Sequence, residues 1–124
     1  MSQLNVNILN NSADSGTDVD VTQLGQSQVL AWVNFNGTGT VEIRDDFGVS
    51  SITDDAVGKY TVNFSPVIPN ENYAWQCNGR GDSSYMLGVH GAWNTTPTTS
   101  ALSIWSGAYN QVEDITYCCV AIFG

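Results

Sequence analysis

Residues 31–44 read AWVNFNGTGTVEIR, two short apolar runs separated by the four residues Asn36-Gly37-Thr38-Gly39. In the second run Val41 and Ile43 alternate with charged residues, the period-two pattern of a strand with one face in the core and one in water. The separating residues include types that tolerate positive φ and tight turns. This stretch therefore predicts an antiparallel β-hairpin.

The hairpin pattern continues through the rest of the chain. Short runs rich in Val, Ile, Thr and aromatic residues alternate with turn signals at the spacing of about 8 to 12 residues that is typical of all-β sandwiches and barrels. Val and Ile together number 20 against six Leu, which also favours strands. We expect an all-β fold, a compact antiparallel β-sandwich that is jelly-roll-like. Its expected strands are residues 29–35, 40–44, 49–53, 59–64, 73–78, 86–90, 100–106 and 116–123.

Residues 1–26 differ from the rest of the chain. They hold no aromatic and no basic residue, and Asp14, Asp18 and Asp20 lie in a background of Ser, Asn, Gln and Gly. A segment of this composition cannot bury much apolar surface by itself. We expect residues 1–26 to form an extended N-terminal arm and residues 27–124 to form the domain. The alternative is a short edge strand of the same domain followed by a loop.

The charge of the chain is one-sided, with a net charge of −9 and three basic residues, Arg44, Lys59 and Arg80. Nucleic acids and anionic membrane surfaces are bound through clustered Lys and Arg, so neither is an expected partner. No apolar run approaches the about 20 residues of a membrane span, and the N-terminal sequence lacks the basic and apolar regions of a secretion signal. We expect a soluble protein with no membrane insertion and no export.

The reactive residues form no catalytic or metal-binding motif. The single histidine, His90, lies in a strand-like run, and the three cysteines have no Cys-x-x-Cys spacing. Acidic pairs at 45–46, 54–55 and 113–114 lack the spacing of a calcium-binding helical hairpin, which leaves solvated carboxylates and a calcium site in a turn as alternatives. We expect no enzymatic activity, no cofactor, and unpaired cysteines in a reduced compartment.

Aromatic residues gather beside polar loops in the second half of the chain. Flat rings next to amides and carboxylates suit sugars, because the C–H faces of a sugar stack on a ring while its hydroxyls need planar hydrogen-bond partners. The alternative is that the rings fill the core and the charged residues form an ordinary turn pair. The candidate ligand-binding residues are Arg80, Asp82, Tyr85, Trp93 and Tyr109.

Two of the expected strands, residues 29–35 and 117–123, are apolar on both faces. A two-layer sandwich buries one face of each sheet. Such a strand therefore takes either a central buried position or a place in a subunit interface. The interface interpretation gives as candidate contact residues Trp32, Tyr117, Val120, Ile122 and Phe123.

Three runs of the sequence resemble a segment common in tail-fibre and other virion proteins of bacteriophages: residues 31–44, residues 49–54 (VSSITD) and residues 58–64 (GKYTVNF). The similarity extends from about residue 28 to residue 74 and resumes at residues 120–124 (VAIFG). It implies a small β-rich fibre or tip domain that forms a homotrimer and has no enzymatic activity. In this family the segment usually ends a much longer fibre chain, which implies here a separate small virion protein or an arm that docks on another virion component.

From this resemblance we expect a non-enzymatic structural protein of the phage virion, assembled in the cytoplasm of the host bacterium. A tail-fibre or tip component that meets host-surface glycan is the first interpretation. Its expected partners are further copies of the chain and another virion protein bound through the N-terminal arm. A capsid decoration or head-fibre protein and a stand-alone carbohydrate-binding module are the alternatives. Residues 78–115 fall outside the similarity, so it implies nothing about the receptor.

Overall fold

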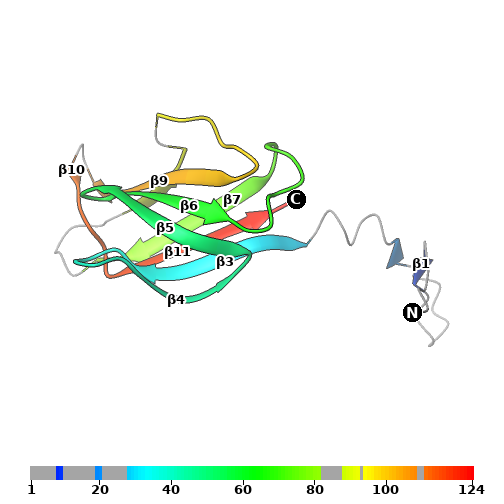
Figure 1. Cartoon of the computed structure of the whole chain (residues 1–124), viewed down its shortest axis with the longest axis horizontal. Coiled ribbons are helices and arrows are strands. Elements are labelled where there is room, and N and C mark those ends of the chain that lie inside the picture. The colour runs from blue at the N-terminus through cyan, green and yellow to red at the C-terminus, as the bar shows by residue number, and fades with distance from the viewer. Residues whose placement is uncertain (1–7, 10–18, 21–27, 82–87, 93, 109–110) are drawn as a thin grey trace.

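The computed structural model of the chain describes residues 8–9, 19–20, 28–81, 88–92, 94–108 and 111–124. These residues form strands, turns and bends, and none of the described segments is a helix, so no described segment could cross a membrane as a helix. Figure 1 shows the strands packed into one body, with a separate pair of short strands beside it. That pair consists of β1 (Ile8–Leu9) and β2 (Val19–Asp20), which are antiparallel to each other.

The body of the protein consists of two antiparallel sheets. The first has the order β4-β3-β11-β7 and is formed by β4 (Glu42–Phe47), β3 (Val29–Asn36), β11 (Tyr117–Phe123) and β7 (Ala74–Arg80). The second has the order β10-β9-β6-β5, with β8 also paired to β9. Its strands are β10 (Gln111–Val112), β9 (Ala101–Ala108), β6 (Lys59–Phe64), β5 (Val49–Ala56) and β8 (Gly88–Gly91).

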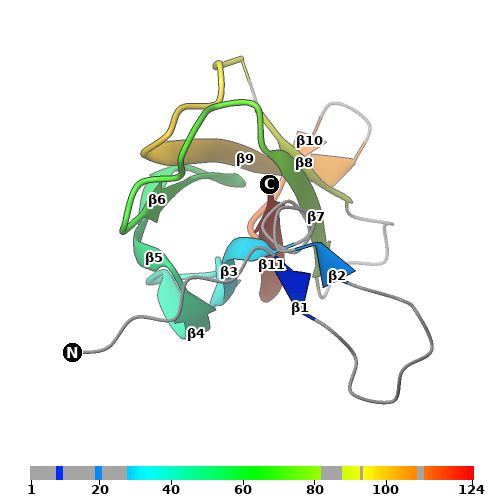
Figure 2. The same cartoon turned by 90° about the vertical axis from the view of Figure 1, so that its right-hand side faces the viewer.

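The core lies between the two sheets, and Figure 2 shows these sheets end-on. Alternate residues of each strand point inward, because successive side chains of a strand point to opposite faces. β6 gives the clearest case, with Tyr60, Val62 and Phe64 buried and the residues between them half-buried. The prediction of an all-β, sandwich-like fold is confirmed, whereas the jelly-roll topology stays a prediction. The inward residues of the other main strands include Ala31, Val33, Phe35, Leu102, Ile104, Cys118, Val120 and Ile122.

The predicted hairpin of residues 31–44 is present as β3 and β4. Its turn is held by the Asn36 side chain, whose Oδ1 accepts hydrogen bonds from the Thr38 backbone N–H (3.1 Å) and from the Thr38 hydroxyl (2.7 Å). Gly39 has a φ of +63°, a conformation for which glycine has no steric penalty. After β4 the chain crosses to the second sheet through the single residue Gly48, whose φ is +68°.

A buried tyrosine ties the two hairpins to the segment before β11. The Tyr60 hydroxyl lies 2.9 Å from Asp114 Oδ1 and 3.0 Å from the Gly37 carbonyl oxygen. The same Asp114 oxygen accepts a hydrogen bond of 2.7 Å from the Gly58 N–H in the turn between β5 and β6. Burial, together with the adjacent Asp114 carboxylate, raises the pKa of Tyr60, so the hydroxyl stays a proton donor. The Asp114 carboxylate and the Tyr60 hydroxyl together link three segments that are distant in the sequence.

The three cysteines lie on the neighbouring strands β7 and β11 and are free thiols. Cys118 is buried, and Cys77 and Cys119 are half-buried. Burial raises the pKa of Cys77 to about 12 and raises that of Cys118 as well. Both groups are therefore protonated thiols at neutral pH and behave as small apolar residues.

Candidate functional site

The loop site predicted from the sequence lies mostly outside the described residues. Of its five candidates, Asp82, Tyr85, Trp93 and Tyr109 belong to segments that the structure does not describe. The fifth, Arg80, is the last residue of β7 and is exposed. The structure therefore leaves this ligand site a prediction.

The interface candidates divide between the two faces of the first sheet. Val120 and Ile122 are 3% and 1% exposed and belong to the core, which corrects their assignment to a surface contact. Trp32 and Tyr117 point outward and are 37% and 43% exposed. Phe123 is half-buried at the end of β11. The strand that is apolar on both faces therefore takes the central buried position along its inner face, and only its outer face is available to another molecule.

The outer face of this first sheet carries a groove of about 380 Å³ that runs over the middle strand, β11. Its floor is formed by small residues of β11, Cys119 and Ala121. In the antiparallel register, Ala121 lies between Trp32 of β3 and Gln76 of β7. One row further along, Cys119 lies between Asn34 and Asn78. The groove exists because the two small residues separate larger side chains on the two flanking strands.

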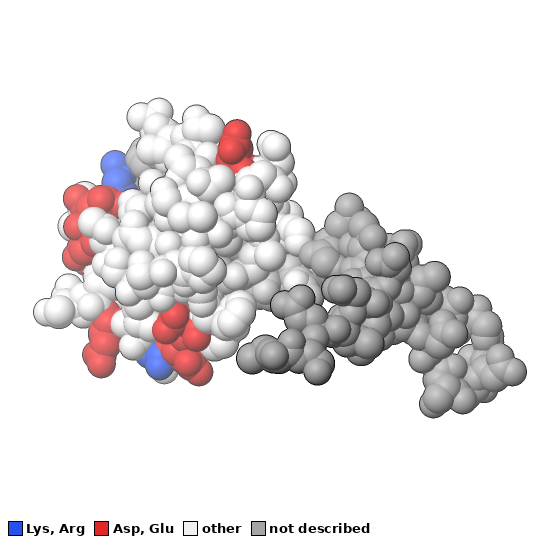
Figure 3. All heavy atoms as spheres, turned by 45° about the vertical axis from the view of Figure 1, so that its right-hand side comes forward, with Lys and Arg blue, Asp and Glu red and all other residues white. Residues whose placement is uncertain are grey.

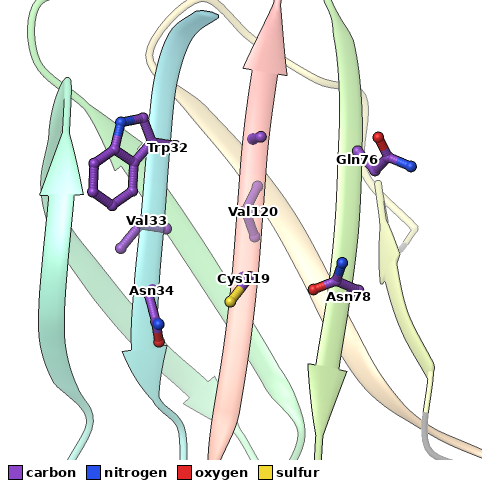
Figure 4. A pocket seen from close by; sticks show the side chains of 8 residues that line it. Trp32, Val33, Asn34, Gln76, Asn78, Cys119 and Val120 are labelled. Atoms are coloured by element: carbon purple, nitrogen blue, oxygen red, sulfur yellow. The ribbon is translucent and has the colours of Figure 1, made fainter.

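Figure 4 shows how the side chains lie around this groove. The indole of Trp32 extends from β3 towards β4 and is seen face-on. The amide of Asn78 and the thiol of Cys119 point towards the middle of the groove, whereas Gln76 extends outward on the far side of β7. The groove thus combines an aromatic plane on one side with amide groups on the other.

Arg44 packs over the outer face of the first sheet, where it contacts the start of β11. Arg44 donates hydrogen bonds to Asn34 Oδ1 (3.3 Å) and to the Thr116 carbonyl oxygen (2.7 Å). Its guanidinium carbon lies 4.1 Å from the centre of the Tyr117 ring, within the range of a cation–π contact. This contact covers the ring of Tyr117 from within the same chain. The bond to Asn34 also occupies the amide oxygen, so that the Asn34 nitrogen is the group left to donate.

The structure brings no metal-binding or catalytic cluster together within its described residues. No group of three or more His, Cys, Asp or Glu there is placed to hold a metal ion. His90 stacks on Trp105, with ring centres 4.6 Å apart and an angle of 24° between the planes. Of the acidic pairs, Asp114 belongs to the Tyr60 network, and Asp55 accepts an exposed hydrogen bond from the Thr61 hydroxyl.

The charged residues leave much of the visible surface neutral. Figure 3 shows the acidic side chains in separate small groups, with large uncharged areas between them. None of the residues that line the groove over β11 is charged. The net charge of −9 is therefore carried elsewhere than in this groove.

The groove was not among the sites predicted from the sequence, although the sequence holds one signal of it. Asn34, Cys119 and Gln76 occupy the outward positions of runs whose inward positions are apolar, but the pairing of these runs could not be known before the fold. Compared with known proteins, the chain matches no protein-family model, no curated protein and no solved structure.

Proposed function

We propose that this protein is a non-enzymatic structural component of a bacteriophage virion, placed at a tail fibre or tip where it contacts the host surface. The proposal starts from the sequence segments at residues 28–74 and 120–124 that resemble phage fibre proteins. It extends to a homotrimer in the virion and to residues 1–26 as the arm that binds another virion protein.

The observation that carries the proposal is the way in which the two similar segments meet. The first segment includes β3, β4, β5 and β6, and the second is the end of β11. In the fold, β11 pairs directly with β3, with Val120 opposite Val33 and Ala121 opposite Trp32. Segments that are separated in sequence thus form one continuous structural unit. This supports the view that the resemblance reflects a shared domain rather than a chance run of similar residues.

The trimer contact is proposed at the end of the first sheet where Phe123 lies opposite Val29. Val29 is 42% exposed although it is apolar, and Phe123 is half-buried. An exposed apolar group at a strand end gains free energy when a second copy covers it. This position replaces the inward residues Val120 and Ile122 as the proposed contact.

The decisive experiment locates the protein and counts its copies. We expect labelling and electron microscopy of phage particles to place it at the tail fibre or tip, and native mass spectrometry at micromolar concentration to give a trimer. Val29→Asp should dissociate the trimer, whereas Val57→Asp, at a position 60% exposed in the turn between β5 and β6, should not. A monomeric wild-type protein would remove the trimer from the proposal, and label on the capsid would favour a decoration protein.

A stand-alone carbohydrate-binding module is the second candidate, and the groove over β11 favours it. Its aromatic plane and amide side chains are groups that bind sugars. The two candidates differ in one measurable respect, because a stand-alone module would be absent from purified particles.

A further inference from the structure

The groove over β11 is open and uncharged, and its lining is mainly apolar, with amide groups on the two flanking strands. Its six outward-pointing residues are one tryptophan, three amides, one alanine and one cysteine. Within the described part of the chain, the side chains of Gln76 and Asn78 make no hydrogen bond. Asn78 therefore has its donor and acceptor groups available to a ligand in the groove, whereas Gln76 points away from the groove (Figure 4).

The tryptophan in this groove offers a flat surface to solvent. Trp32 is 37% exposed and lies beside Phe47 of β4 in the register of the sheet. Exposing an aromatic ring costs free energy that burial in the core would recover. A polar ligand with a flat face of C–H groups can stack on this ring and cover it, although the rest of the ligand is hydrophilic.

The amide side chains of Asn34 and Asn78 determine which hydrogen-bonding groups the ligand must have. Asn34 has its oxygen engaged by Arg44, which holds the amide in place and leaves its nitrogen as a donor. Asn78, on the opposite strand, points into the groove (Figure 4) and offers both a donor and an acceptor. A ligand with several hydroxyls satisfies both side chains, because a hydroxyl donates and accepts at once.

We propose that the groove over β11 binds a neutral oligosaccharide of a cell-surface glycan, with one pyranose face stacked on Trp32 and hydroxyls of the adjoining sugar units bonded to Asn34 and Asn78. The inference rests on the proposed role in host contact and names its ligand class. It assigns recognition to the face of the first sheet instead of to the loops. The volume of about 380 Å³ lies within the range of small-molecule sites.

The other occupants of such a groove fit less well. An added peptide strand needs free backbone groups at a sheet edge, but β11 is hydrogen-bonded to β3 on one side and to β7 on the other. An anionic ligand would need a positive charge, and no lining residue is charged.

The test uses the full-length protein with defined probes: trisaccharides of glucose, galactose and N-acetylglucosamine, with the anionic sugar sialyllactose as comparison. We expect at least one neutral trisaccharide to bind with a millimolar dissociation constant, measured by saturation-transfer NMR and by titration up to about 10 mM. Trp32→Ala and Asn78→Ala should each weaken binding about tenfold or more. Ala121→Phe should block it by filling the groove without removing any binding group.

Trp75→Ala is the matched control, because Trp75 is 39% exposed on the same sheet but lies outside the groove lining. It should bind sugar as the wild type does, and thermal melts should show that every variant is folded. Failure of all three neutral trisaccharides to bind overturns the inference, and so does unchanged binding by a folded Trp32→Ala protein. Particle labelling and trimer mass are measured separately from sugar binding. If no sugar binds, the groove is not a sugar site, but the proposed virion role is unaffected. If sugar binds but the protein is absent from particles, the groove site is supported and the virion role is overturned.

Discussion

Two glycines with the same backbone conformation differ in what surrounds them. Gly39 and Gly58 have φ values of +63° and +64°. A Cβ at Gly39 would meet nothing within 4 Å, whereas at Gly58 it would lie 2.7 Å from the Glu113 nitrogen and from the Ser106 carbonyl oxygen. The first position therefore tests the conformation alone, and the second tests conformation and packing together.

We expect Gly39→Ala to lower the free energy of unfolding by about 1 kcal/mol, the cost of a left-handed conformation for a residue with a Cβ. Gly58→Ala should lower it by about 3 kcal/mol or more, because backbone atoms of the facing segment must also shift. Urea denaturation followed by tryptophan fluorescence measures both. Equal losses in the two variants would mean that the Gly58 turn can open freely.

The Tyr60 hydroxyl gives a second prediction at the scale of single residues. Tyr60→Phe keeps the ring and removes the hydrogen bonds to Asp114 and to the Gly37 carbonyl, so we expect a loss of about 1 to 2 kcal/mol. Asp114→Ala should cost more, because it removes the acceptor of the Gly58 N–H and one of the two acceptors near the Tyr60 hydroxyl. Asp55→Ala is the control, since its bond to the Thr61 hydroxyl is exposed and should contribute little. Chemical denaturation at pH 7 ranks the three variants, and a control that ranked first would contradict the network.

At the scale of elements, the thiols of β7 and β11 make the free energy of unfolding depend on pH in the alkaline range. The pKa of Cys77 is raised by burial from 9.0 to about 12. Above pH 9 the unfolded chain loses this proton while the folded protein keeps it, so the free energy of unfolding falls as pH rises, by up to about 1.4 kcal/mol per pH unit for one thiol. Below about pH 8 both states are protonated, and this group has no effect.

We expect urea denaturation of the wild type to show a loss of stability between pH 8.5 and pH 10, and Cys77→Ala to show a smaller loss. The tyrosine of the unfolded chain ionises around its ordinary pKa of 10.0, above most of this window, whereas the unfolded thiol ionises around 9.0, so the thiols dominate the change. A parallel pH profile for wild type and variant would show that Cys77 ionises equally in both states. Alkylation by iodoacetamide at pH 8 gives an independent check, because a protonated, half-buried thiol reacts slowly.

The existence and approximate positions of the main strands could be predicted from the alternation of apolar and polar residues and from the turn residues. The ends of the strands and their pairing partners could not. The run at 59–64 matches β6 residue for residue. The strand expected at 49–53 instead continues through Asp54 and Asp55 to Ala56, because the turn is made by Val57 and Gly58 and leaves the acidic side chains exposed. The groove was missed for a related reason, since it needs Trp32 and Asn78 to be two strands apart, which only the pairing of β11 with both neighbours establishes.

At the scale of the whole molecule, we predict that residues 1–26 act in assembly rather than in folding. Deleting them should change the free energy of unfolding by no more than about 1 kcal/mol, the scale for a segment with few buried contacts. The shortened protein should fail to enter phage particles. Thermal melts and gel analysis of purified particles measure the two effects. If the shortened protein unfolds, the segment is an integral part of the domain and the boundary at residue 27 is misplaced.

The position of β11 between β3 and β7 also governs how quickly the protein reaches its native state. Arg44 and the Thr116 carbonyl, which meet at the start of this strand, are 72 residues apart in the chain. Closing so long a loop costs entropy before its contacts compensate, and folds dominated by distant pairings form on a scale of about milliseconds to seconds. Until β11 enters, β3 and β7 each present an unpaired edge to any other chain nearby. Refolding should therefore give more soluble protein from dilute than from concentrated solution.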